Sequence, residues 1–462
     1  MMDIDLPLDQ NFNQPPRRPA EAWDEAADEN NESKKKKTST IIVDNPTLDL
    51  ESYSANYVGH TRVERLIFIA EHSPPLAIDA YKIALNDLKN TMDYTRYTVV
   101  HQKLNDLLLG RGLPTIPLDQ TWVDNTKKAQ RAKTEKLERE LKDYKSNLIK
   151  ESIRMGHNDL GDHLYDSGDL SGALKSYSRT RDYCTTSKHI VDMCINVARL
   201  SMELNNFAHV QSYVVKAETT PDIPEKNIVT SKLNCIMGLV NLEAGKFKRA
   251  ARNFLDTSFE LNTHFSEVLS PNDVAIYGGL CALATFDRSE LKSRVFDNAD
   301  FKQFLELEPQ VRELLSNFYH SKYSLCLDIL EKMKNDLYLD IWLHGHVDMI
   351  YQSIRKKALV QYFYPFLSVD LNLMAQAFST TVPELEQELA TLITSKEIQA
   401  RIDSHNKILR IKSADQRTNI FEKSLAMGSD YQTQVKHMLL RMKLVRADMI
   451  VRPPERDRHD SS

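Results

Sequence analysis

The residues best suited to chemistry are His344 and His346, which are separated only by Gly345. Two imidazoles at this spacing can begin a catalytic zinc site, but such a site needs three protein ligands and an open position. Asp348 follows too closely to complete the set, and no Asp or Glu occurs from Met349 through Val369. On a helix the two rings would also point about 200° apart. The sequence therefore predicts no metal site and no catalytic residues.

A second candidate is a cluster of four aspartates, at positions 159, 162, 166 and 169. It lacks the alternating ligands and the terminal Glu of a calcium loop, and Asp169 follows Gly168 at a predicted turn. We interpret the cluster as turn chemistry. The chain also has no Walker, G-x-G-x-x-G, G-x-S-x-G or H-E-x-x-H motif, so we predict no cofactor and no enzymatic activity.

The composition favours a helical protein. The 462 residues include only 13 Gly, whereas average usage would give about 32. Doubly wound sheets and β-sandwiches need glycine in many tight turns, so these folds are disfavoured. No proline occurs between Pro117 and Pro221 or between Pro383 and Pro453, as long helices require. The predicted fold class is mainly α.

Charge and cysteine usage restrict the partners and the compartment. Sixty Lys and Arg against 65 Asp and Glu give a net charge of -5, which does not favour nucleic acid or membrane as partners. The five cysteines form no C-x-x-C pair and are interpreted as reduced, buried thiols. The longest apolar stretches fall short of the ~20 residues that span a bilayer. We expect a soluble protein of the cytoplasm and nucleus.

Both ends of the chain are predicted to be disordered, over residues 1–40 and 452–462. The first tail is rich in proline and acidic residues and has few apolar ones. Its four-lysine run, Lys34 to Lys37, could be a nuclear import signal. Only one other basic pair, Arg17 and Arg18, could extend such a signal, so we interpret the lysine run as a stretch of solvent-exposed charge.

Two segments share a pattern at fixed spacing within a predicted helical-repeat arm, residues 45–260. The first has Leu160, Gly161, Leu164, Gly168, Ala173 and Tyr177, and the second has Met237, Gly238, Leu242, Gly245, Ala250 and Phe254. They resemble tetratricopeptide repeats, in which one glycine lets two helices approach and the next ends the first helix. A weaker copy is expected around Val197, Leu200, Phe207 and Tyr213.

Residues 126–150 predict an amphipathic helix with a strong excess of basic residues. Its apolar seam is Leu137, Leu141, Tyr144 and Leu148. A basic face of this kind is usually solvated. The alternative is a docking stripe for an acidic protein surface, with Lys127, Lys128 and Arg131 as its candidate residues.

A winged helix is predicted at residues 368–412, at the end of a domain spanning 261–412. Asp370 precedes a short apolar helix, and Thr381 with Glu384 forms a capping box that opens a second helix. Alternation then predicts a hairpin whose apolar positions are Ile398, Ala400, Ile402, Leu409 and Ile411. These five residues are candidates for contact with another subunit, because edge strands pair readily.

Winged helices often bind DNA through the second helix. Here that helix carries Glu384, Glu386 and Glu388 and no basic residue before Lys396, whereas a groove-reading helix must neutralise phosphates. We therefore favour protein binding over nucleic-acid binding.

The last predicted element is one long helix over residues 415–451, interrupted only at Gly428. Its candidate bundle residues follow an a/d spacing and are Tyr431, Val435, Met438, Met442, Val445 and Met449. Such a seam needs partner helices, either from its own domain or from other subunits. Its methionines and flanking basic residues favour other subunits.

Helical repeats followed by a winged helix and a terminal helix resemble the PCI family, which is shared by the proteasome lid, the signalosome and translation initiation factor three. The segment from Tyr53 to Ala70, with Asn56-Tyr57-Val58-Gly59 and Arg62-Val63-Glu64-Arg65, resembles the signalosome members. Proteasome lid members are the alternative.

The resemblance implies a non-catalytic scaffold. In this family the winged helices of neighbouring PCI subunits lie side by side, and the C-terminal helices gather in a bundle. For signalosome members it also implies cullin-RING ubiquitin ligases as partners, from which the complex removes a ubiquitin-like modifier. The isopeptidase chemistry is then expected in a different, zinc-bearing subunit.

Overall fold

The computed structural model describes residues 41–223, 225–412 and 416–449, and both predicted tails lie outside these ranges. The described chain is mainly helical with one small sheet near its C-terminal end, which confirms the predicted fold class. It divides into two compact units. The first comprises residues 41–185 with two inserted segments, 266–268 and 334–347, and the second comprises the rest.

The first unit contains α1 (Leu50–Ala55), α2 (His60–His72), α3 (Ala77–Lys89), α4 (Tyr94–Gly110), α5 (Gln120–Ser146), α6 (Lys150–Asp166), α7 (Leu170–Arg179) and η1 (Thr180–Tyr183). The second contains α8 (Ser187–Glu203), α9 (Phe207–Glu218), α10 (Lys226–Glu243), α11 (Phe247–Leu255), η2 (Phe259–Phe265), α12 (Pro271–Thr285), α13 (Arg288–Leu291), η3 (Lys292–Phe296), α14 (Ala299–Leu307), α15 (Pro309–Tyr319), β1 (Ser368–Asp370), α18 (Leu371–Ala377), α19 (Val382–Thr394), β2 (Ala400–Asp403), β3 (Ile408–Ile411) and α20 (Gln416–Arg446). Two helices, α16 (Tyr323–Tyr338) and α17 (Val347–Phe363), each have one end in the first unit.

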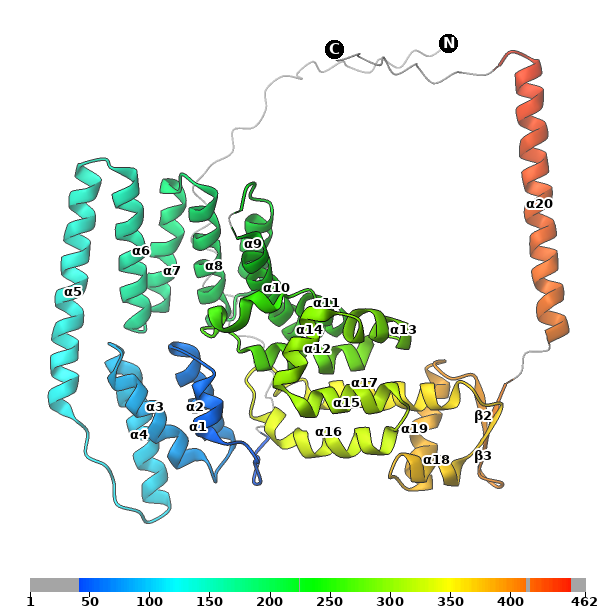
Figure 1. Ribbon diagram of the computed structural model, residues 1–462, viewed down its shortest axis with the longest axis horizontal. Coiled ribbons are helices and arrows are strands. Elements are labelled where there is room, and N and C mark those ends of the chain that lie inside the picture. Colours follow the sequence, from blue (N-terminus) through cyan, green and yellow to red (C-terminus); the bar gives the residue numbers. More distant parts are fainter. Residues whose placement is uncertain (1–40, 224, 413–415, 450–462) are drawn as a thin grey trace, which may run out of the picture. The chain divides into compact units, whose positions relative to one another are not determined.

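The two strong repeats form helical hairpins as predicted, α6–α7 in the first unit and α10–α11 in the second (Figure 1). A Cβ on Gly161 would lie 2.8 Å from the ring of Tyr177, and one on Gly238 would lie 2.6 Å from the ring of Phe254. No larger residue fits at either crossing without a shift. The second glycine of each repeat ends its helix at positive φ, 84° at position 168 and 70° at position 245.

The weak copy is α8–α9, but its register differs from the predicted one. Phe207 and Tyr213 are only partly buried. The residues at the positions of the glycine, alanine and aromatic of the strong repeats are Ala198, Val210 and Val214, and all three are completely buried. The sequence pattern was misleading because smaller side chains fill this crossing.

The same helix stop recurs in four hairpins and needs glycine in only two of them. Asn205 and Ser321 take the left-handed conformation at φ of 56° and 61° in the α8–α9 and α15–α16 hairpins. In all four, the next residue donates its N–H to a carbonyl five residues back, at 2.8–2.9 Å. This bond satisfies a carbonyl that the helix end leaves unpaired. The low glycine content is therefore compatible with many tight turns.

A buried arginine joins three separate stretches of the first unit. Arg65 on α2 is 1% exposed, and its Nη1 donates to Oδ2 of Asp340 and to Oη of Tyr53, each at 2.6 Å. The guanidinium carbon also lies 4.2 Å from the ring centroid of Tyr57. Asp340 in turn accepts two backbone N–H bonds from the turn that follows it. Carboxylate, hydroxyl and ring face together compensate for the water that the guanidinium has lost.

This pair explains why the segment 334–347 belongs to the first unit. Asp340 lies 275 positions after its partner in the sequence. Nearby, the backbone N–H of Thr47 donates to Asp336 at 3.0 Å, and the side-chain amide of Asn335 donates to the carbonyl of Asn45 at 3.3 Å. The chain before α1 is thus attached at two points to the last turn of α16.

We predict that Arg65→Met destabilises the first unit by about 3–5 kcal/mol, because it leaves the Asp340 carboxylate buried without its cation. Urea unfolding of the full chain, followed by tryptophan fluorescence, measures the change. The matched control is Lys103→Met, which breaks an ion pair with Glu71 whose side chains are 46% and 42% exposed. The control should cost no more than about 1 kcal/mol, and equal losses in the two variants would contradict the assignment.

Candidate subunit interfaces

The predicted winged helix is present, with one strand more than expected. Helices α18 and α19 are followed by the hairpin β2–β3, and β1 joins the sheet in the order β1-β3-β2, with both pairings antiparallel. The strand β1 has three residues, too few for an alternating pattern to indicate a strand. Asp370 ends it and also caps α18, by accepting from the backbone N–H of Asn372 at 2.8 Å.

The strand order changes what the predicted interface residues can do. Because β3 pairs on both sides, only β1 and β2 offer free edges. Ile398, Ala400 and Leu409 are 0–5% exposed and pack in the core of the domain, so their side chains are not available to another subunit. Ile402 is partly buried, and Ile411 is 37% exposed.

The structure adds an apolar surface that the sequence analysis missed, which we call the wing patch: Tyr364, Phe366, Leu367 and Ile411. The first three are 85%, 46% and 77% exposed. The backbone N–H of Ile411 donates to the carbonyl of Leu367 at 3.0 Å, so the chain before β1 continues along β3. The available signal was the apolar run between the end of α17 and Asp370.

The acidic residues of α19 have structural partners. Glu386 accepts from Lys407 in the hairpin turn at 3.0 Å, and Glu388 accepts from Arg355 on α17, also at 3.0 Å. Both glutamates are partly buried, so the expected fully exposed acidic face is reduced to Glu384. Charge on this face is therefore largely neutralised within the domain.

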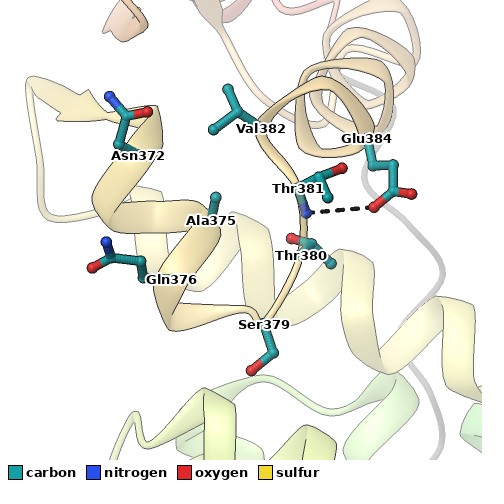
Figure 2. Close-up of a pocket in the computed structure, with 8 residues that line it drawn as sticks. All are labelled: Asn372, Ala375, Gln376, Ser379, Thr380, Thr381, Val382 and Glu384. Carbon is teal, nitrogen blue, oxygen red and sulfur yellow. Dashed lines mark hydrogen bonds between the residues drawn. The ribbon is translucent and has the colours of Figure 1, made fainter.

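The hollow between α18 and α19 is lined mostly by polar residue types and includes the capped start of α19 (Figure 2). It has a volume of about 460 Å³ and is lined by Asn372, Ala375, Gln376, Ser379, Thr380, Thr381, Val382 and Glu384. The backbone N–H of Thr381 donates to Glu384 at 3.4 Å, which completes the predicted capping box (Figure 2). A carboxylate at the helix start, with no cation among the lining residues, disfavours a phosphate there.

Helix α20 exposes apolar side chains on more than one side. In the predicted seam, Tyr431, Met438, Met442 and Val445 are 52–69% exposed, and Val435 is partly buried. Leu440 is 56% exposed and lies two residues from a seam position, hence on the opposite side of the helix. Apolar side chains exposed on more than one side of a helix require neighbouring surfaces on each of those sides.

The end of α20 differs from the prediction. The helix runs without a break through Gly428 but stops at Arg446, short of residue 451. Asp448 is left-handed at φ 50°, and the backbone N–H of Met449 donates to the carbonyl of Leu444 at 3.0 Å, which closes the helix. Met449 therefore lies beyond the end of the helix and is not part of the helical seam. Its side chain is 71% exposed.

The basic helix is α5, and it starts earlier than predicted because Asp119 caps it by accepting from the backbone N–H of Trp122 at 3.1 Å. Lys128 and Arg131 are exposed, whereas Lys127 is partly buried, 5.8 Å from the ring centroid of Tyr94. Of the seam, Leu137, Leu141 and Tyr144 pack against α6 in one apolar cluster. Leu148 lies past the helix end and is 81% exposed, so it does not belong to the seam.

His344 and His346 lie in a turn rather than on a helix, which corrects the geometry assumed above. Nδ1 of His344 is 2.7 Å from the carbonyl of Tyr338, and its ring packs against the ring of His72. Burial lowers the pKa of His344. Among the described residues, no group of three or more His, Cys, Asp or Glu is arranged to hold a metal ion.

Two members of the aspartate cluster have structural roles, and one of them, Asp169, lies in the predicted turn. Asp169 caps α7 by accepting from the backbone N–H of Gly172 at 2.9 Å, and Tyr177 donates its hydroxyl to Asp162. Burial raises the pKa of Asp159. Four of the five cysteines are buried, and Cys184 is partly so; burial raises the pKa of Cys235 and Cys281 to about 12, as expected for inert thiols. Within the described ranges, no helix is long and apolar enough to cross a bilayer.

Three family models match the chain in succession. The model of 26S proteasome subunit RPN7 matches residues 119–294, the PCI domain matches residues 301–413, and the C-terminal helix of COP9 signalosome complex subunit 1 matches residues 416–442. The predicted resemblance to the PCI family is confirmed. The chain is thus a PCI-domain protein with a helical-repeat arm.

Relatives that align over most of the chain show to which subunit family it belongs. COP9 signalosome complex subunit 1 of Arabidopsis thaliana is 50% identical over 408 residues, covering 88% of this chain and 91% of the relative. Subunit 1b of Drosophila melanogaster is 43% identical, covering 93% and 90%, and subunit 1 of Emericella nidulans is 41% identical, covering 89% and 85%. The chain belongs to the COP9 signalosome complex subunit 1 family.

Proposed function

We propose that this chain is a non-catalytic scaffold subunit of a COP9 signalosome, which removes a ubiquitin-like modifier from cullin-RING ubiquitin ligases in the cytoplasm and nucleus. The observation that carries the proposal is α20, whose large apolar side chains are exposed on several sides. Such a helix is completed by helices of other subunits. The isopeptidase chemistry is assigned to another subunit, because His344 and His346 find no third ligand among the described residues.

Assembly is proposed to use two surfaces of the second unit. The first is α20, through Tyr431, Val435, Met438, Met442 and Val445. The second is the wing patch together with the free edge of β2, where the main chain can pair with a neighbouring PCI subunit. The match of residues 119–294 to 26S proteasome subunit RPN7 is the observation that favours a proteasome subunit as the second candidate.

A third surface, the basic face of α5, is proposed to contact an acidic region of the ligase substrate. Lys128 and Arg131 are exposed. Contacts between exposed charges are strengthened by steering and weakened by salt.

We expect Met438→Asp to abolish incorporation into the complex while the repeat hairpins stay folded, because a charge buried in the bundle costs several kcal/mol. Purification of the tagged chain from cells, with mass spectrometry of its companions, measures incorporation. The control Gln432→Asp adds the same charge at a polar position of α20 and should keep the full set of partners. Recovery of that set with Met438→Asp would refute the role of α20.

The wing patch predicts a partial defect. Leu367→Asp should remove the neighbouring PCI subunit from the purified complex yet leave the subunits held by α20, since the two surfaces act separately. Gln376→Asp, on the exposed side of α18, is the matched control. Loss of all partners, or of none, would contradict this division of roles.

Reversal of the basic face should affect substrate binding alone. With Lys127, Lys128 and Arg131 changed to Glu, we expect the affinity of the assembled complex for a cullin-RING ligase to fall at least tenfold at low salt and less at high salt. Surface plasmon resonance across a salt series measures it. The control reverses three exposed basic residues nearer the end of α5: Arg139, Lys142 and Lys145. Equal loss in both variants would show a general charge effect instead of a docking face.

A further inference from the structure

A pocket in the second unit lies between η3, α14 and α15, away from the winged helix in the sequence. Its volume is about 340 Å³, and it is lined by Val295, Phe296, Lys302, Leu305, Glu306, Arg312, Ser316 and His320. This volume falls at the lower end of the range for ligand sites. A pocket of this size can hold one side chain of a bound peptide, with the neighbouring peptide residues at its rim.

The inner wall of the pocket is apolar and fixed. Val295 and Leu305 are 0% and 4% exposed. Phe296 is partly buried, and its ring centroid lies 5.0 Å from that of Tyr319, whose carbonyl accepts from Arg288. An aromatic or large aliphatic side chain entering the pocket would meet surfaces that are already held in place.

The rim is cationic and unneutralised. Lys302 and Arg312 are exposed and form no ion pair or side-chain hydrogen bond among the residues whose positions are described. His320 is oriented by its Nδ1, 2.8 Å from the carbonyl of Ser316. Glu306 is the one acidic lining residue. In the same unit other basic groups do have carboxylates, such as Lys248 with Glu290 at 3.1 Å.

The wall also contains an unusual stretch of backbone. Residues 292–296 form a π-helix, closed by the N–H of Asp297 donating to the carbonyl of Lys292 at 2.9 Å. Such π-turns are rare and are frequent at functional sites. This turn carries both Val295 and Phe296, which form the apolar wall.

We infer that this pocket docks an acidic peptide segment of a partner protein, with one aromatic or large aliphatic anchor flanked by Asp or Glu. The anchor fills the space between Phe296 and Leu305, and the flanking carboxylates face Lys302 and Arg312. The inference goes beyond the scaffold role, because neither α20 nor the wing patch takes part. Nucleic acid fits less well, since the apolar wall and Glu306 offer little to a phosphate backbone.

The test uses the full chain and a fluorescein-labelled, end-capped peptide of sequence Asp-Glu-Asp-Phe-Glu-Asp-Glu in an anisotropy titration. We expect binding in the micromolar range and at least a tenfold loss in the double variant K302E/R312E. Replacing Phe by Ala in the peptide should cause a similar loss, and this arm requires no change to the protein.

The matched control is the double variant R249E/K322E, which reverses two exposed charges of the second unit outside the pocket and should bind as the native chain does. No binding by the native chain, equal losses in the two double variants, or indifference to the Phe→Ala change would each overturn the inference. Tighter binding of a single-stranded oligonucleotide that K302E/R312E abolishes would overturn it as well.

Discussion

The first unit depends on a buried charge that it cannot leave unpaired. Arg65 is enclosed by two tyrosines of the α1 region and by the carboxylate of Asp340, which lies in the turn after α16. Because an isolated guanidinium in the interior is costly, these stretches must assemble together. The constraint places a segment from within the PCI-domain match, residues 334–347, in the first unit, so the boundary between units does not follow the order of the sequence. Tyr53, Tyr57 and Arg65 all lie in the segment from Tyr53 to Ala70, on which the resemblance to the signalosome members was first based.

The helical hairpins could be predicted where their close contacts require glycine. Gly161 and Gly238 mark crossings at which an aromatic ring leaves no room for a side chain. The α8–α9 and α15–α16 hairpins have the same left-handed stop, but Asn205 and Ser321 stand where the repeat pattern has glycine, so the pattern alone did not locate them. The pairing of Arg65 with Asp340 was beyond prediction, because nothing local indicates a contact across 275 positions.

The sequence predicted which helices and strands carry the candidate interfaces, but it identified only some of the side chains that are exposed on them. Alternation located the hairpin, yet it marks the side of a strand that faces the core, and Ile398 and Leu409 are on that side. Most of the wing patch lies in the loop before β1, which has no periodic pattern that could indicate it. The seam of α20 was found because the a/d spacing is long enough to stand out, whereas its end depends on the backbone conformation of Asp448.

Helix α20 has a consequence for the life of the polypeptide before assembly. A rod with leucine, methionine and tyrosine facing water on several sides lowers solubility and favours association with other newly made chains. Synthesis in excess of its companions would therefore be harmful, and chaperones or proteases can recognise the surplus by the same side chains that the finished complex hides. Exposure of α20 thus distinguishes an unassembled chain from one in the complex. For the same reason, the subunits must be supplied in matching amounts.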